Sequence, residues 1–159
     1  MSQPEQTSCY CADLADLAAV PMGGDGRDER VFATLENVCD HGGDLWWLYL
    51  SKCSACGQAW MIAQEERIFD EYFLRRVTDS EVANIRQHRW PVEFISYERV
   101  LKTGHLFASP CIFLDSMSSS LIWSAHDLRQ ARPDISVEEI AHLLGVTVSN
   151  AKRLLKAKR

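Results

Sequence analysis

The chain has 159 residues, of which 47% are hydrophobic, and a formal net charge of −5 at pH 7. It is long enough to bury a real core in one domain, or in a small domain with an appended module. The residues after Met1 are polar, and no apolar run approaches the ~20 residues that a membrane span needs. The sequence therefore argues against a secretory or membrane protein and predicts a cytoplasmic one.

Charge is distributed unevenly along the chain. Residues 1–126 carry 18 Asp and Glu against 10 Lys and Arg, a net charge of −8, whereas residues 127–159 carry 4 against 7, a net charge of +3. We expect the two parts to prefer different partners, because net charge governs long-range attraction.

Two cysteines, Cys9 and Cys11, lie near the amino terminus, directly before a short run at residues 13–20 that looks helical. A Cys-x-Cys pair is a weaker metal signal than Cys-x-x-Cys, because the side chains of an extended chain point to opposite sides at this spacing. The pair can bind a metal only if the backbone kinks and a second pair joins it.

The next segments predict a loop and then a strand. The composition of residues 21–28 is that of a loop. The apolar residues of 30–37 alternate, which is typical of a strand. Cys39 and His41 follow, before a Gly-Gly turn, and are reserve metal ligands; on such a turn they also need no metal at all.

A metal knuckle on a β-hairpin is predicted between the apolar runs 45–50 and 58–63. Cys53 and Cys56 are three residues apart and are followed by Gly57, which allows the positive φ that a tight turn requires. Cysteines of a reducing compartment are more often ligands or buried thiols than disulfides. We predict a closed, structural Zn²⁺ site whose four ligands are Cys9, Cys11, Cys53 and Cys56.

Two alternatives to this ligand set remain open. Cys39 and His41 can close the site if the amino-terminal pair does not take part. Otherwise Cys9 and Cys11 are small apolar residues near the terminus, and the Cys53–Cys56 pair is an isolated turn.

After the hairpin the sequence predicts one more strand and then helices. Residues 67–77 fit either a helix face or a strand, and their aromatic and β-branched content favours a strand. The later segments are a helix at 79–88 capped by Asp79 or Ser80, a helix at 94–103 ended by Gly104, a buried strand or irregular core segment at 105–114, and a helix at 121–131.

Residues 134–159 resemble a helix-turn-helix of the kind found in bacterial DNA-binding proteins. Ser136 and Glu139 predict a capping box, Gly145 the turn and Thr147 the cap of the last helix. In that helix Val148, Ala151 and Leu155 are expected to face inward. The residues predicted to contact nucleic acid are Ser149, Asn150, Lys152, Arg153 and Lys156. Such a hairpin also occurs as a plain packing unit.

No catalytic residues are predicted. His126 and Asp127 are adjacent, and side chains one residue apart on a helix do not face each other. Cys111 lies among apolar neighbours, which favour an inert thiol. Two close thiol pairs describe a closed zinc site rather than a catalytic one with an open position. We therefore expect a binding protein without a small-molecule substrate.

An acidic cluster after the hairpin predicts a surface for a basic protein partner. The cluster comprises Glu65, Glu66, Asp70 and Glu71. The Cys-x-Cys start and the segment YLSKCSACGQAW resemble small cysteine-knuckle proteins encoded beside bacterial polymorphic toxins. This resemblance implies an immunity protein that binds and inhibits a cognate toxin. We rank that function first, and a helix-turn-helix transcriptional regulator that binds DNA is the alternative.

The expected fold class is α+β. A small antiparallel sheet with the zinc knuckle should occupy residues 1–78. A helical region should follow at 79–159, with 134–159 as its helix-turn-helix-like end.

Overall fold

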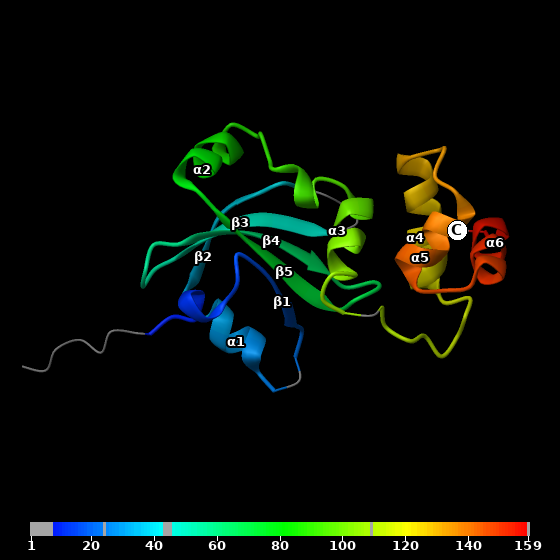
Figure 1. Ribbon diagram of the computed structural model, residues 1–159, viewed down its shortest axis with the longest axis horizontal. Coiled ribbons are helices and arrows are strands. Elements are labelled where there is room, and N and C mark those ends of the chain that lie inside the picture. Colours follow the sequence, from blue (N-terminus) through cyan, green and yellow to red (C-terminus); the bar gives the residue numbers. More distant parts are fainter. Residues whose placement is uncertain (1–7, 24, 43–45, 109, 159) are drawn as a thin grey trace, which may run out of the picture. The chain divides into compact units, whose positions relative to one another are not determined.

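The computed structural model describes residues 8–23, 25–42, 46–108 and 110–158. Within these residues the fold is α+β, with a five-stranded antiparallel sheet and helices, as expected (Figure 1). The chain forms two compact units. The first comprises Met1–Gln64 and Glu71–Pro91, and the second comprises Glu65–Asp70 and Val92–Arg159. Among the described residues no helix is both long and apolar enough to cross a bilayer.

The sheet has the strand order β1-β5-β4-β3-β2. Its strands are β1 (Leu17–Pro21), β2 (Leu35–Asp40), β3 (Trp47–Cys53), β4 (Ala59–Glu65) and β5 (Glu71–Val77). The predicted hairpin is β3 and β4, in which Ser51 pairs with Trp60 and Lys52 with Ala59. β4 is the central strand of the sheet, and nearly all of its side chains are buried. This burial explains why most of its residues are apolar.

The amino-terminal third differs from the sequence prediction in two places. Residues 13–20 do not form a helix: a 3₁₀ turn, η1 (Cys11–Asp13), precedes β1, which pairs with β5. The strand expected at 30–37 is also wrong in its first half. α1 (Arg27–Phe32) begins inside the predicted loop, and β2 starts only at Leu35. Asp28 and Glu29 in the first turn of α1 favour this helix, because acids stabilise the positive end of the helix dipole.

One core cluster lies where η1 and α1 pack against the sheet. α1 contacts β1 and β2, and its Val31 is buried there. The cluster joins these segments to β4 and β5, and its buried members are Cys11, Leu14, Ala18, Val20, Val31, Cys53, Trp60, Ile62 and Leu74. Two of the four candidate metal ligands therefore belong to the hydrophobic core.

α2 (Asp79–Arg86) confirms the first helix predicted after the sheet. Its cap is Thr78, one residue before the expected Asp79 or Ser80. The Thr78 hydroxyl accepts a hydrogen bond from the Glu81 amide at 3.2 Å, and the Glu81 carboxylate accepts one from the Thr78 amide at 3.1 Å. This reciprocal arrangement is a full capping box.

The second unit contains a 3₁₀ turn and helices. These are η2 (Val92–Phe94), α3 (Tyr97–Gly104), α4 (Ser119–Ala131), α5 (Val137–Leu144) and α6 (Val148–Lys156). The last three pack on one another. In α6 the buried residues are Ala151 and Leu154, while Leu155 is only half-buried and Val148 is exposed. The inward face expected for this helix is thus correct for Ala151 and wrong for Val148.

Gly104 was predicted to follow its helix as the terminating residue, but it lies inside α3. It is the last residue of the helix, and a Cβ built on it would lie 2.6 Å from Cε2 of Phe69. Close packing on the Phe69 ring is therefore the reason for a glycine here. The described residues of the segment 105–114 are irregular and form no buried strand, because Leu106 is 72% exposed and Ile112 is 97% exposed.

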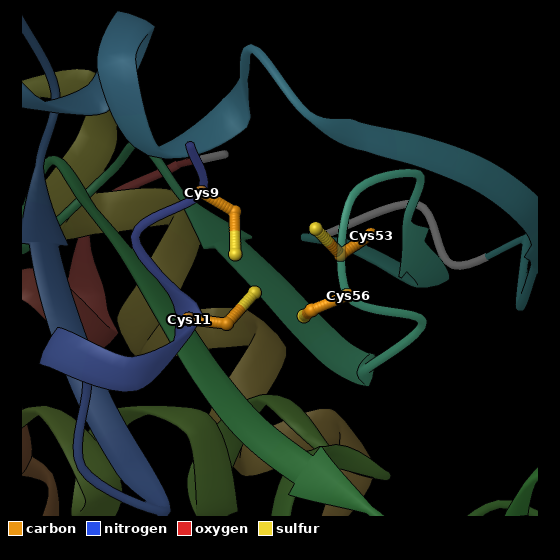
Figure 2. Close-up of side chains that lie close together, drawn as sticks. All are labelled: Cys9, Cys11, Cys53 and Cys56. Carbon is orange, nitrogen blue, oxygen red and sulfur yellow. The ribbon is translucent and has the colours of Figure 1, made fainter. Parts of the chain in front are cut away.

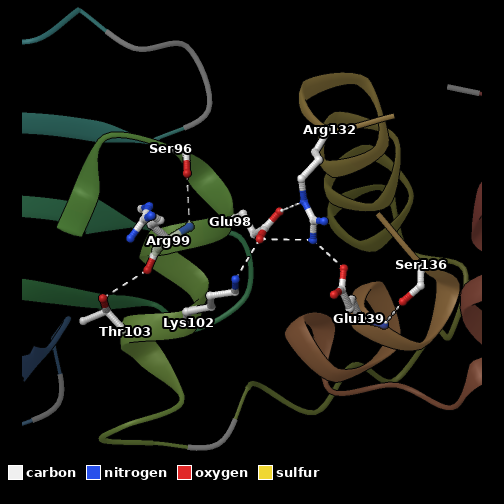
Figure 3. Close-up of polar contacts among 8 residues, drawn as sticks. All are labelled: Ser96, Glu98, Arg99, Lys102, Thr103, Arg132, Ser136 and Glu139. Atoms are coloured by element: carbon white, nitrogen blue, oxygen red, sulfur yellow. Dashed lines mark hydrogen bonds and ion pairs between the residues drawn. The ribbon is translucent and has the colours of Figure 1, made fainter. Parts of the chain in front are cut away.

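An ion-pair network joins α3, the end of α4 and the start of α5 (Figure 3). Glu98 accepts from Arg132 Nε at 2.8 Å and pairs with Lys102 Nζ at 2.8 Å. Arg132 also pairs with Glu139. The expected Ser136 cap forms, with Oγ accepting from the Glu139 amide at 3.1 Å, but the Glu139 carboxylate engages Arg132. The sequence indicated the cap correctly but missed this partner.

A four-cysteine cluster as the candidate metal centre

The β3–β4 turn positions the first two sulfurs. Cys53 ends β3, and its backbone carbonyl accepts from the Gly57 amide at 2.9 Å while its amide donates to Gln58 O at 2.9 Å. Gly57 has a φ of 80°. A side chain at this φ would be strained, so glycine permits the sharp return that brings Cys53 and Cys56 together.

The other two sulfurs come from the kinked segment before β1. Tyr10 has φ −95° and ψ 1°, which bends the chain between Cys9 and Cys11. This bend supplies the kink that a Cys-x-Cys pair needs. Arg76 of β5 holds the segment in place, because its guanidinium donates to the carbonyls of Cys11 and Leu14.

The four sulfurs of Cys9, Cys11, Cys53 and Cys56 all lie within 4.8 Å of one another. Figure 2 shows the two pairs pointing toward a common space from opposite sides. Four thiolates at about 2.3 Å from a tetrahedral zinc would be about 3.8 Å apart. The observed separations therefore need a contraction of at most about 1 Å to enclose an ion. The predicted convergence of two distant pairs is confirmed, and the cluster can hold a metal.

The sulfurs differ in their surroundings. Cys11 and Cys53 are buried, whereas Cys56 is exposed. Burial raises the pKa of the Cys11 thiol to about 12, although the Trp60 indole donates to its sulfur at 3.3 Å. At Cys53 burial also acts to raise the pKa, but the hydrogen bond between its sulfur and the Thr34 hydroxyl and the one from the Cys56 amide outweigh burial and lower the pKa to about 6. The lowered pKa favours the thiolate of Cys53, which is the form that binds a cation.

The reserve ligands do not join this cluster. Within the described part of the chain, the metal-capable group consists of the four cysteines without Cys39 or His41. Cys39 is on β2, opposite Leu50 of β3. The His41 ring lies 5.5 Å from the Trp90 ring, edge to face. The geometry therefore supports the prediction that Cys9 and Cys11 supply the other two ligands.

The predicted acidic partner surface is only partly on the surface. Glu65 is fully buried, and its carboxylate accepts from the Tyr97 hydroxyl at 2.8 Å and from the Phe69 amide at 2.6 Å. It is a structural carboxylate in the second unit and cannot meet a partner. Glu71 is half-buried, and burial raises its pKa. Of the four predicted residues, Glu66 and Asp70 are exposed.

The residues predicted to contact nucleic acid lie mainly on the outer face of α6. Ser149, Lys152, Arg153 and Lys156 are exposed. Asn150 differs, because it is half-buried and its Nδ2 donates to the Ser116 carbonyl at 3.1 Å. Asn150 therefore holds the segment before α4 and is not presented outward as the sequence suggested.

The side chains considered for catalysis have separate partners. His126 Nε2 lies 2.8 Å from the Ala157 carbonyl, whereas the Asp127 carboxylate pairs with Arg67 at 2.7 Å. The Cys111 sulfur is half-buried and 3.9 Å from the Asp70 carboxylate, so its surroundings are less apolar than its sequence neighbours suggested.

Sequence reasoning missed the residues that surround the cluster. Thr34, Trp60 and Arg76 touch the cysteine segments, and the Arg76 guanidinium also stacks 4.5 Å above the Trp60 ring. Nothing in their local sequence relates them to Cys11 or Cys53, because they come from other strands or from the segment before β2. Trp60 lies in the predicted hairpin arm at 58–63, and nothing in that run indicated its contact with sulfur.

Comparisons with models of known families, with curated proteins and with solved structures found no match to this chain.

Proposed function

We propose that the four-cysteine cluster binds one structural Zn²⁺. The donor set supports zinc, because zinc is commonly bound by four thiolates in a tetrahedral arrangement. Such a site leaves no open position for a substrate. The ion would join the segment before β1 to the β3–β4 turn. The expected result is one zinc per chain by elemental analysis of protein purified without added metal. A chain that folds fully without any bound metal would contradict the proposal.

We further propose that the chain is a non-enzymatic DNA-binding protein that contacts DNA through α5 and α6. The observation that carries this proposal is the cationic outer face of α6. Lys152, Arg153 and Lys156 are exposed there, and among the described residues no carboxylate pairs with them. Unpaired cations on one helix face suit a phosphate backbone or the base edges of a groove.

The local construction of α5 and α6 supports this reading. Gly145 has a φ of 70° and makes the turn between the helices. The Thr147 hydroxyl accepts from the Asn150 amide at 3.1 Å and so begins α6. The inner faces of both helices are buried with α4. A rigid support behind an exposed reading helix is what groove recognition requires.

The test is binding of the full chain to duplex DNA, measured by fluorescence anisotropy over a range of salt concentrations. Lys152→Ala and Arg153→Ala should each weaken binding about tenfold and reduce the salt slope by about 1. Lys102→Ala is the matched control, because this exposed lysine of α3 pairs with Glu98. Equal affinity of all four proteins, or none at any salt, would overturn DNA binding through α6.

A second candidate is the protein inhibitor of a basic toxin that the sequence favoured. The observation in its favour is a surface formed by two adjacent loops of the second unit. The Cys111 amide donates to the Ile68 carbonyl at 2.7 Å, and the Cys111 sulfur lies 3.9 Å from the Asp70 carboxylate. The loop that carries exposed Ile112 therefore lies beside the loop that carries exposed Glu66 and Asp70. Apolar side chains beside carboxylates suit a partner that offers an apolar pocket and basic residues.

The two candidates predict opposite sensitivities. A protein partner recovered with the untagged chain should bind more weakly to the double variant Glu66→Gln/Asp70→Asn and be indifferent to Lys152→Ala. DNA binding should show the reverse. If a toxin-like partner binds the Glu66→Gln/Asp70→Asn variant as tightly as it binds the parent chain, this surface is not its binding site.

A further inference from the structure

The second unit contains a cavity of about 460 Å³ beside the turn between α5 and α6. One side is formed by the segment before α4, including Pro110 and Phe113, and by Leu121 of α4. The other side is formed by the turn and the start of α6, including Val146 and Arg153. Its volume is within the range of sites that hold small molecules.

Contacts between its walls hold the cavity in shape. A Cβ built on Gly145 would lie 2.7 Å from Cγ of Pro110, so the turn and the loop are packed as closely as glycine allows. Asn150 Nδ2 donates to the Ser116 carbonyl at 3.1 Å. The Cys111 amide donates to Ile68 O at 2.7 Å and anchors the loop from behind. A preformed cavity binds its ligand without first ordering a loop.

The lining offers both apolar and cationic side chains. The apolar side chains are Phe113 and Leu121 on one side and Val146 on the other. Ser149 and Arg153 supply hydroxyl and guanidinium groups. Among the described lining residues there is no Asp or Glu, and no described carboxylate pairs with Arg153. A guanidinium group can donate two parallel hydrogen bonds to one carboxylate. Apolar side chains beside it favour a ligand that also has a hydrophobic body.

We propose that this cavity is a binding site for a small amphipathic carboxylate, with the carboxylate on Arg153 and the apolar body against Phe113, Leu121 and Val146. The proposal goes beyond DNA binding and is tested without DNA, so either one can fail alone. Arg153 belongs to both, and a bound carboxylate would compete with a phosphate for it.

The experiment follows amide chemical shifts of the full ¹⁵N-labelled chain during titration with three probes: phenylacetate, its uncharged counterpart phenylacetamide, and inorganic phosphate. Phenylacetate should give saturable shifts at residues on both walls. Phenylacetamide should bind at least about tenfold more weakly, because a charge-assisted hydrogen bond is worth roughly 1.5–3 kcal/mol. Arg153→Gln should cause the same loss, and Lys156→Gln, which removes an exposed charge on the same helix outside the cavity, should not.

The remaining outcomes overturn the proposal. If phosphate binds as well as phenylacetate does, and the amides of Phe113 and Val146 do not shift, the site is a simple anion contact of the kind used for a DNA backbone. Equal binding of phenylacetate to the parent chain and to Arg153→Gln would place the probe elsewhere. No saturable shift with phenylacetate, in a protein whose spectrum shows a folded chain, would exclude a site for this class of ligand.

Discussion

The four-cysteine cluster and the α5–α6 pair are built in opposite ways. The cluster draws its sulfurs from two segments more than 40 positions apart in the sequence, and two of the four are buried in the core. The α5–α6 pair is local, with caps, turn and exposed face contained in one short stretch. The first region should therefore fail as a whole when one ligand is lost. The second should weaken by small, separable amounts.

The largest effect is expected from Cys53→Ser. This change removes a buried ligand from the cluster and leaves three sulfurs without a closed site, so the zinc and the connection between the two segments should be lost together. We expect destabilisation by at least ~3 kcal/mol, measured by denaturant unfolding, with loss of zinc by elemental analysis. Cys39→Ser is the control, because Cys39 is a cysteine of the same sheet outside the cluster. A Cys53→Ser protein that keeps both its zinc and its stability would show that the cluster is not a structural site.

Gly145→Ala tests the local region at its most constrained position. Alanine here would have to adopt a φ of 70°, and its Cβ would lie 2.7 Å from Pro110 Cγ. The strained backbone and the clash should together cost about 2 kcal/mol in the free energy of unfolding. Gly23→Ala separates the two causes, since Gly23 has a φ of 72° and nothing within 4 Å of the added carbon. If both variants lose the same stability, the contact with Pro110 contributes nothing.

Thr147→Ala removes the cap of α6 without touching its cationic face. The lost hydrogen bond to the Asn150 amide should cost about 1 kcal/mol. Thr78→Ala is a useful comparison, because Thr78 caps α2 with a full reciprocal box. Unfolding by denaturant should show both losses. An unchanged stability of Thr147→Ala would mean that α6 does not depend on its own cap.

The same contrast explains which features could be read from the sequence. The hairpin, the Cys53–Cys56 turn and the caps at Ser136 and Thr147 depend on neighbours in the chain, so spacing and turn chemistry predicted them. The convergence of Cys9 and Cys11 on that turn was predicted only from the chemical need for four ligands. Local patterns failed where a distant partner decides the outcome, because pairing with β5 makes 17–21 a strand.

Buried polar groups were the least predictable. The sequence places Glu65 in an acidic cluster, which normally indicates a solvated surface. The structure buries it, because the backbone turn after β4 and the Tyr97 hydroxyl supply enough donors to replace water. The turn amides and the hydroxyl of Tyr97, which is 32 residues away, distinguish Glu65 from the exposed Glu66. This difference also reduces the support for an acidic inhibitor surface.

The smallest effect is expected from Glu98→Gln, which tests whether the α3–α4–α5 connection is electrostatic. Burial acts to raise the pKa of Glu98, but hydrogen bonds from Arg132 and Lys102 outweigh it and hold the pKa below the ordinary value of 4.5. A carboxylate with a depressed folded-state pKa stabilises the protein above pH 4.5, and this contribution disappears as the pH falls through the folded-state pKa. Because Arg132 and Lys102 are partly exposed, we expect Glu98→Gln to lose only about 0.5–1 kcal/mol at neutral pH.

The pH dependence distinguishes this electrostatic role from simple packing. The difference in unfolding free energy between the parent chain and Glu98→Gln should be constant near neutral pH and shrink toward zero in acid. Glu138→Gln, at an exposed carboxylate of α5, should stay within about 0.5 kcal/mol of the parent throughout. A Glu98→Gln loss that persists unchanged in acid would show that the side chain acts by shape. In that case the α5–α6 pair would depend on packing with its neighbours in the second unit.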